Sequence, residues 1–234
     1  MPSTVTVAEQ TYPVRLKRSR RARRLTLRVA TDGIVIVIPQ RLPAQLGWKF
    51  LSDHQTWLTR VLKLQQRREQ QLPQRHYISG EKIPFLGSEL TLQVKSASRS
   101  KVHYDALEQT LSIEHPARTA ARTVIEKWYR EQAQLYFTAT ATGLAATIGA
   151  RFTTISIRQA KTRWGSCSSR GTLSFNWRLL LAPAGIAHYV TAHEVAHLKH
   201  LHHQPRFWRL VAELDPAYLE HKRWLKHHGR ELVL

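Results

Sequence analysis

One run near the C-terminal end, residues 184–199, constrains this chain more than any other. It contains no proline, and its apolar residues recur at helical spacing, so the pattern predicts a helix. His193, Glu194 and His197 form an H-E-x-x-H pattern within it. Positions four apart lie on one face of a helix, so the two imidazoles can point at one place. The pattern predicts a zinc site with Glu194 beside the ligands. The alternative is that this pattern arises by chance on a solvent-exposed helix, because the chain contains 13 histidines.

A third protein ligand is needed, because a catalytic zinc takes three and keeps one position open. His203 follows His197 after five intervening residues and is the expected third ligand. This choice requires the chain to leave the helix after His197 and turn back. The alternatives are the adjacent His202 and, from a following helix, Glu213 or Glu220.

The N-terminal half is expected to be rich in strands and to hold one long helix. Residues 24–29 alternate, Asp32-Gly33 supplies a tight turn, and residues 34–38 return as a strand that ends at Pro39. An apolar stripe over residues 43–71 predicts the long helix. Four further short strands are expected at residues 82–86, 89–94, 102–104 and 110–113.

The second half is expected to be mostly helical. Residues 117–148 predict a helix whose apolar stripe includes Leu135 and Tyr136, and residues 152–157 predict a strand. A Gly/Ser-rich hairpin precedes a strand at 172–175, which we expect can pair with an extended peptide. Two more helices are expected, at 206–214 and 217–228. The predicted fold class is α+β, with a strand-rich basic part over residues 1–115 and a metal-binding catalytic part over 116–234.

The charge of the chain is strongly positive and uneven. The formal net charge is +20, and residues 1–75 hold 15 Lys and Arg against 4 Asp and Glu. Such an excess favours an anionic partner, either a nucleotide or a nucleic acid or other polyanion bound through the N-terminal half. Solvated faces that keep the protein soluble explain the same charge.

Cysteine usage and hydropathy indicate a location. The single cysteine, Cys167, excludes an intramolecular disulfide and weakly favours a reducing compartment. The first residues lack an apolar signal core, and no apolar stretch approaches the roughly 20 residues that span a bilayer. We therefore expect a cytoplasmic protein without a membrane partner. The sequence does not indicate an oligomeric state.

Three motifs together resemble the YgjP-like family of metal-dependent hydrolases, which is related to SprT-like and WLM-type zincins. They are Arg-Trp-Gly-Ser-Cys-Ser at 163–168, Leu-Ser-Phe-Asn-Trp-Arg-Leu at 173–179, and the His193-Glu194-x-x-His197-x5-His203 run followed by Pro-Arg-Phe-Trp at 205–208. The resemblance covers most of the chain. It implies a zincin-like helical core on a small sheet, His193, His197 and His203 as the ligands of one zinc ion per chain, and Glu194 as catalytic base.

Three residues near the motif are open to more than one interpretation. Arg163 is the best candidate for holding an anionic substrate group or stabilising an oxyanion, but it could equally stack on Trp164 or pair with a carboxylate. Cys167 could be a fourth ligand or a redox-sensitive thiol, although a small buried residue in a tight hairpin is favoured. Asn176 is expected to cap the following helix.

The expected function is zinc-dependent hydrolysis of the metallopeptidase type, in which Glu194 takes a proton from a metal-activated water. One alternative is a phosphoanhydride hydrolase that releases pyrophosphate from nucleoside triphosphates, which the arginine excess suggests. The other is a non-catalytic, nucleic-acid-associated metal-binding protein.

Overall fold

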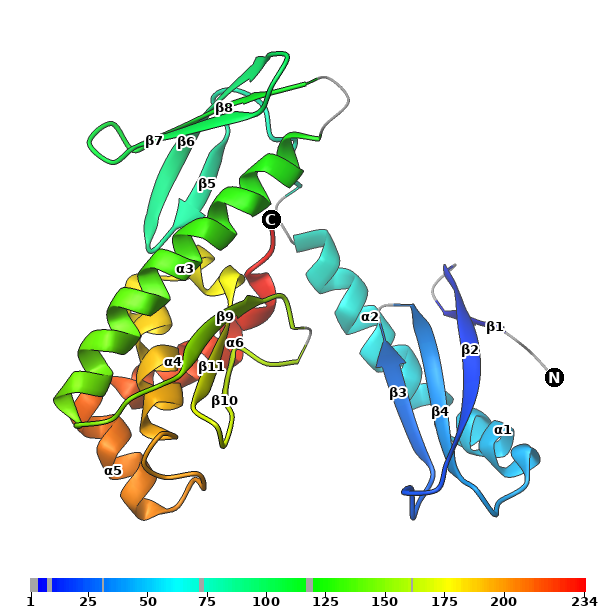
Figure 1. The fold of residues 1–234 in the computed structure, drawn as a ribbon. Coiled ribbons are helices and arrows are strands. Elements are labelled where there is room, and N and C mark those ends of the chain that lie inside the picture. The colour runs from blue at the N-terminus through cyan, green and yellow to red at the C-terminus, as the bar shows by residue number, and fades with distance from the viewer. Residues whose placement is uncertain (1–3, 8–9, 31, 72–73, 117–119, 161) are drawn as a thin grey trace. The chain divides into compact units, whose positions relative to one another are not determined.

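The computed structural model describes residues 4–7, 10–30, 32–71, 74–116, 120–160 and 162–234. The chain divides into two compact units, residues 1–73 and residues 74–234, and each is described by itself. Within the described residues the fold is α+β, with three small sheets and six α-helices (Figure 1). No helix in these ranges combines the length and the apolar character needed to cross a membrane.

The first unit contains a four-stranded sheet. Its strands are β1 (Thr4–Val7), β2 (Gln10–Ser19), β3 (Thr26–Ala30) and β4 (Gly33–Pro39), in the order β1-β2-β4-β3. β3 and β4 form the antiparallel hairpin that the alternation and the Asp32-Gly33 pair predict. Gly33 has a φ of +128°, and an added Cβ would lie 2.4 Å from the Pro13 carbonyl oxygen, so only glycine fits there.

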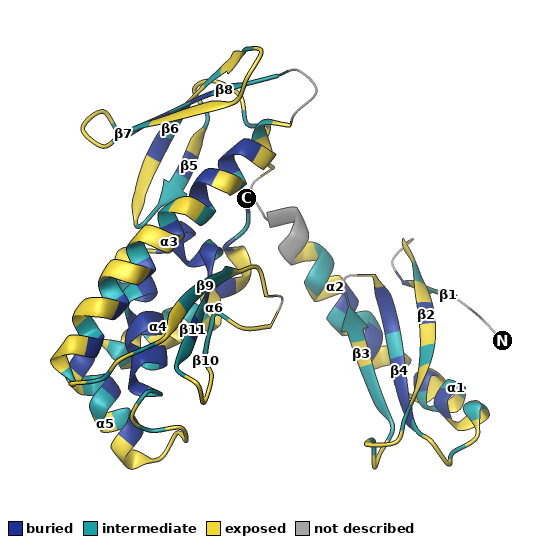
Figure 2. Cartoon of the chain, viewed as in Figure 1, coloured by how far each residue is buried: buried dark blue, intermediate teal, exposed yellow. Residues whose placement is uncertain are grey.

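Two helices, rather than the predicted single one, pack on one face of this sheet. α1 (Ala44–Asp53) and α2 (Gln55–Gln71) are separated at His54, whose φ of −109° departs from helical values. Ser52 and Asp53 favour helix ends over helix interiors, which weakens the helix at this point. Leu51, Leu58 and Leu62 nevertheless belong to one buried cluster with Ile34, Ile36 and Ile38 of β4. Figure 2 shows buried residues on β4 and on both helices.

The second unit begins with a sheet of the same connectivity. β5 (Lys82–Phe85), β6 (Ser88–Ser96), β7 (Lys101–Asp105) and β8 (Thr110–His115) have the order β5-β6-β8-β7. In both sheets the outer pairs are antiparallel and the central pair is parallel. The predicted boundary at residues 115 and 116 lies inside this second unit, between β8 and the next helix.

The long helix α3 (Ala121–Thr147) carries the core of the second unit. Its buried stripe runs through Val124, Ile125, Trp128, Tyr129, Ala133, Phe137, Ala141 and Ala145. The ring of Phe137 stacks on Phe175 at 4.5 Å between centroids. Leu135, predicted to belong to this stripe, is instead 66% exposed, and Tyr136 is only partly buried. In the C-terminal half of α3 the buried positions are Ala133, Phe137, Ala141 and Ala145 instead of Leu135 and Tyr136.

A three-stranded sheet lies beside the predicted metal helix. Its strands are β9 (Thr154–Arg158), β10 (Gly165–Cys167) and β11 (Thr172–Asn176), in the order β10-β11-β9. The prediction that residues 172–175 can pair with a peptide is wrong, because β11 is the central strand and pairs with β10 and β9. β10 and β9 are the two edge strands.

The remaining elements are helical. The short 3₁₀ helix η1 (Trp177–Leu181) starts at Asn176, whose side chain accepts a hydrogen bond from the backbone N–H of Arg178, as the capping prediction requires. α4 (Ala184–Ala196), α5 (Pro205–Leu214) and α6 (Tyr218–His228) follow, and η2 (Gly229–Glu231) comes last.

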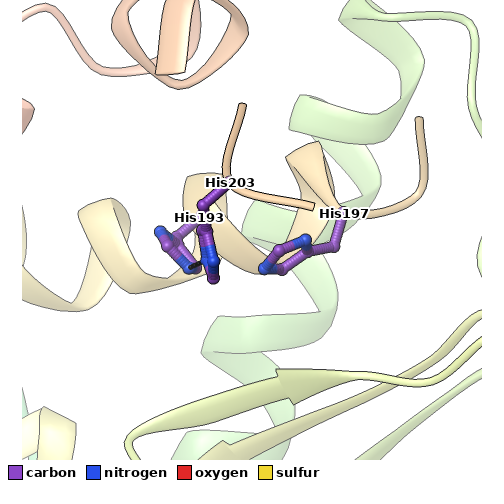
Figure 3. A group of neighbouring side chains, drawn as sticks. All are labelled: His193, His197 and His203. Carbon is purple, nitrogen blue, oxygen red and sulfur yellow. Dashed lines mark hydrogen bonds between the residues drawn. The ribbon is translucent and has the colours of Figure 1, made fainter. Parts of the chain in front are cut away.

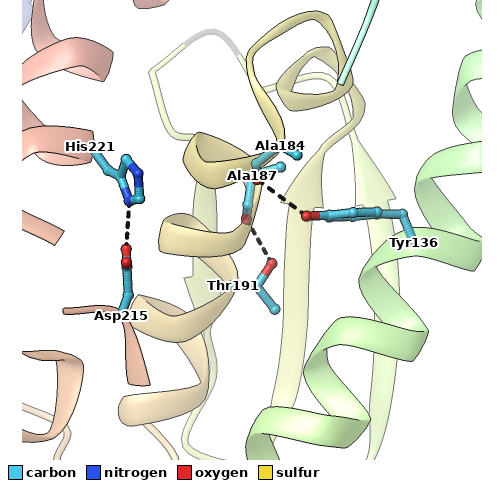
Figure 4. Close-up of polar contacts among 6 residues, drawn as sticks. All are labelled: Tyr136, Ala184, Ala187, Thr191, Asp215 and His221. Carbon is cyan, nitrogen blue, oxygen red and sulfur yellow. Dashed lines mark hydrogen bonds and ion pairs between the residues drawn. The ribbon is translucent and has the colours of Figure 1, made fainter. Parts of the chain in front are cut away.

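Polar contacts hold α4 among its neighbours (Figure 4). The Tyr136 hydroxyl of α3 donates to the Ala184 carbonyl at 3.3 Å. Asp215, which is buried at the end of α5, pairs with Nδ1 of His221 in α6 at 2.8 Å. The first contact ties α3 to the start of α4, and the second ties the end of α5 to α6.

Candidate metal centre

The end of α4 and the turn after it position the candidate ligands. α4 ends at Ala196, and His197 occupies the C-cap position with helical φ and ψ of −64° and −19°. The backbone N–H groups of Lys199 and His200 bond back to Ala196, which closes the turn. Pro205 then starts α5 at its first position, where a missing N–H costs nothing. The chain therefore leaves the helix after His197, as a ligand role for His203 requires.

The structure brings His193, His197 and His203 together (Figure 3). One nitrogen of each imidazole lies within 4.8 Å of the other two. The Nε2 atoms of His193 and His203 are 3.0 Å apart. In the described residues this group includes neither His202 nor Glu213 nor Glu220.

These distances fit a metal ion. A tetrahedral ion with bonds of about 2.0–2.1 Å places its ligand nitrogens about 3.3 Å apart. The 3.0 Å between the Nε2 atoms of His193 and His203 and the 4.8 Å limit for the whole group lie on either side of that spacing. The proton on Nδ1 of His197 is directed at the His200 carbonyl at 3.0 Å, which leaves its Nε2 lone pair for the ion. Nδ1 of His193 is buried and has no hydrogen-bond partner within the described part of the chain.

The electrostatics favour neutral imidazoles, the form that binds metals. Burial, followed by the neighbouring His197, His203 and Lys222, lowers the pKa of His193 to about 3. Burial also lowers the pKa of His197, against the effect of its bond to the His200 carbonyl. The imidazoles of His193 and His197 therefore offer lone pairs without competing protons at neutral pH.

The first turn of α5 packs against the imidazoles. Phe207 is fully buried, stacks on His197 at 4.5 Å between ring centroids and meets His193 edge-on at 4.9 Å. Trp208 stacks on the exposed His203 at 5.6 Å. Aromatic packing of this kind restricts the ring orientations before any ion binds.

Glu194, next to His193, is held against β10. Its side chain is 6% exposed, and burial raises its pKa to about 8. A Cβ added to Gly165 would lie 2.6 Å from Oε1 of Glu194, so the strand backbone touches the carboxylate. Glycine at this position is therefore what allows Glu194 to occupy its place.

Two other predicted residues lie near the site without joining the histidine group. Arg163 is exposed two residues before Gly165 and lines a cavity of about 450 Å³. Cys167 is half-buried at the end of β10, where burial and then the Glu194 charge raise the pKa of its thiol to about 11. That pKa disfavours the thiolate that a fourth metal ligand would require.

Two residues that affect the site were not predicted from the sequence. The ammonium of Lys222 lies 4.0 Å from the Trp208 ring centroid, and its charge acts on His193. Nothing in the sequence connects a lysine in α6 to the end of α4. The contact between Gly165 and Glu194 was also not predicted, although the position of Gly165 inside the Arg-Trp-Gly-Ser-Cys-Ser motif could have indicated a role at the site.

Three imidazoles converge, and the buried carboxylate of Glu194 lies on α4 next to the first of them, His193. This arrangement defines a candidate metal-dependent hydrolase. The model of the YgjP-like metallopeptidase domain matches residues 23–228, and the chain belongs to this YgjP-like family. No curated protein matches the chain. The crystal structure of the metallopeptidase zymogen of Pyrococcus abyssi abylysin is similar at 23% identity and a TM-score of 0.36, over 39% of this chain and 93% of that chain.

Proposed function

We propose that the protein is a zinc-dependent metallopeptidase with one zinc ion per chain. Three imidazole nitrogens are a donor set that suits zinc and leaves a fourth position open. The observation that carries the proposal is the approach of His193, His197 and His203 to within 4.8 Å of one another, beside the buried Glu194. A zinc ion bound there would supply a Lewis acid and lower the pKa of a nearby water.

Glu194 is the proposed general base. Burial raises the pKa of Glu194 to about 8, and a cation bound by the histidines would act in the opposite direction and favour the carboxylate. A buried carboxylate is poised to take the proton of the attacking water and to pass it to the leaving amine nitrogen. The contact with Gly165 holds the carboxylate in one position while it does so.

Arg163 has a proposed role in binding rather than in proton transfer. Its guanidinium can hold two oxygens of an anionic group, and it lies on the chain directly before Trp164 and Gly165. A contribution to oxyanion stabilisation also stays a proposal. Both roles predict that Arg163→Gln weakens substrate use without removing the metal.

The deciding experiment incubates zinc-loaded protein with casein and, separately, with the four nucleoside triphosphates. New peptide termini that appear with the native protein, and not with Glu194→Gln, support the proposal. Release of pyrophosphate without peptide cleavage would instead support the nucleotide alternative. Neither product, combined with nucleic-acid binding that weakens steeply with salt, would support the non-catalytic alternative.

A further inference from the structure

Within the second unit, a basic cavity lies at the start of the edge strand. Its volume of about 450 Å³ is in the range of small-molecule sites. Among the described residues that line it are four cationic side chains, those of Arg163, Arg178, Lys226 and Arg230, and no carboxylate side chain. Trp164, Leu225 and Leu232 supply an apolar wall. The cavity therefore suits an anionic group attached to an apolar body.

The charge of the cavity is not neutralised from within. Nε of Arg178 is buried and has no hydrogen-bond partner among the described residues. Burial lowers the pKa of Arg178, and the nearby Arg122 and Arg130 act in the same direction, whereas Glu126 opposes them. A bound anion would offset the positive charge that Arg163, Arg178, Lys226 and Arg230 bring to the lining of the cavity.

The position of the cavity relates it to the candidate catalytic carboxylate. Arg163 and Trp164 directly precede Gly165, which touches Glu194. Two residues of chain span at most about 7 Å. Arg163, in the lining of the cavity, therefore lies within about 7 Å along the chain of Gly165, where Glu194 makes its contact. β10 is an edge strand of its sheet, and such a strand can pair with an extended peptide.

We propose that this cavity binds the C-terminal carboxylate of a peptide substrate, two or three residues beyond the cleaved bond. A peptide that pairs antiparallel with β10 runs against it, so its carboxyl end passes Gly165 and then reaches Trp164 and Arg163. The apolar wall would contact the last side chain, and the four cations would hold the carboxylate. The proposal rests on the peptidase function proposed above and adds a preference for free C-terminal ends.

The first test uses a peptide identified as a cleaved site in casein. It is made with a free carboxylate two or three residues after the cleaved bond, and as the matching C-terminal amide. We expect kcat/KM to be at least about tenfold higher for the acid, as for a charge-assisted contact. The double variant Lys226→Gln/Arg230→Gln should bring this ratio close to one. Lys101→Gln, which removes an exposed cation in β7, should leave the ratio unchanged.

Equal cleavage of acid and amide by the native protein would overturn the proposal, as would an acid preference that survives in the double variant. A preference for an acidic group on the amino-terminal side of the cleaved bond would contradict the antiparallel direction.

A binding measurement separates this proposal from the proposed function. Calorimetry with the Glu194→Gln protein compares a tripeptide acid with its amide, and needs no turnover. Tighter binding of the acid, lost in Lys226→Gln/Arg230→Gln, supports the cavity assignment even if no peptide is cleaved. Equal binding of both tripeptides, with a nucleoside triphosphate bound more weakly by the double variant, would make the cavity a phosphate site and reject the carboxylate.

Discussion

Replacing Gly165 by alanine tests how closely β10 controls the candidate base. The added Cβ would lie 2.6 Å from both Cγ and Oε1 of Glu194 and 2.9 Å from Cδ. Ordinary contact begins near 3.4 Å, so the carboxylate or the strand must move by about 0.8 Å. A misplacement of about 1 Å at a reacting group costs roughly 100-fold in rate. We therefore expect kcat on casein to fall by about two orders of magnitude while the zinc content stays at the native value.

The same substitution should cost stability through overpacking. Extra atoms in a packed site typically cost about 1–3 kcal/mol in the free energy of unfolding, which urea denaturation measures. Because Glu194 is the group in the way, the cost should be much smaller in a Glu194→Ala background. The control is Gly143→Ala in α3, where nothing lies within 4 Å, and a gain of about 1 kcal/mol is expected. Full turnover by Gly165→Ala, or equal costs in both backgrounds, would refute the proposed contact.

Three further outcomes follow from the same geometry. Glu194→Gln should keep the metal and lose about 10²- to 10⁴-fold in kcat, and near-native turnover would remove Glu194 from the mechanism. His221→Ala leaves the Asp215 carboxylate buried without its 2.8 Å partner, so urea denaturation should show a loss of about 1–3 kcal/mol; an unchanged midpoint would mean that the pair is dispensable. Since burial, and then Glu194, raise the pKa of Cys167 to about 11, only about one thiol in a thousand ionises at pH 8, and iodoacetamide should react slowly and faster as pH rises. Labelling at pH 8 as fast as that of glutathione would contradict this assignment.

The histidine group could be predicted because the constraints that form it are local. His193 and His197 are one helical turn apart, and the turn that returns His203 needs only the residues between Ala196 and Pro205. The hairpin of β3 and β4 was predictable for the same reason, since a tight turn joins two alternating strands.

Long-range packing could not be read from the sequence. The pairing of β11 with β9 is parallel and non-local, so no short turn indicates that β11 is central. The contact of Glu194 with Gly165 joins residues 29 positions apart and depends on how α4 packs against β10. The exposure of Leu135 follows from α3 burying alanines at positions 133, 141 and 145, which hydrophobicity alone does not single out.

The sheet connectivity shows a related limit. The strands β1–β4 and β5–β8 share one topology, yet the sequence indicates no internal repeat. Alternation and turn residues fix each strand, but strand order depends on which edges meet in the folded chain. The division of the chain at residues 115 and 116, the cytoplasmic location and the polyanion partner stay predictions.

The central claim is that three particular imidazoles hold one metal ion, and metal content per chain tests it most directly. Elemental analysis of purified, zinc-loaded protein should find about one zinc ion per chain. His193→Ala, His197→Ala and His203→Ala should each lose it, whereas His200→Ala and His202→Ala, which remove neighbouring histidines outside the group, should retain it. Retention of zinc by His203→Ala, or its loss from His202→Ala, would contradict the assigned ligand set.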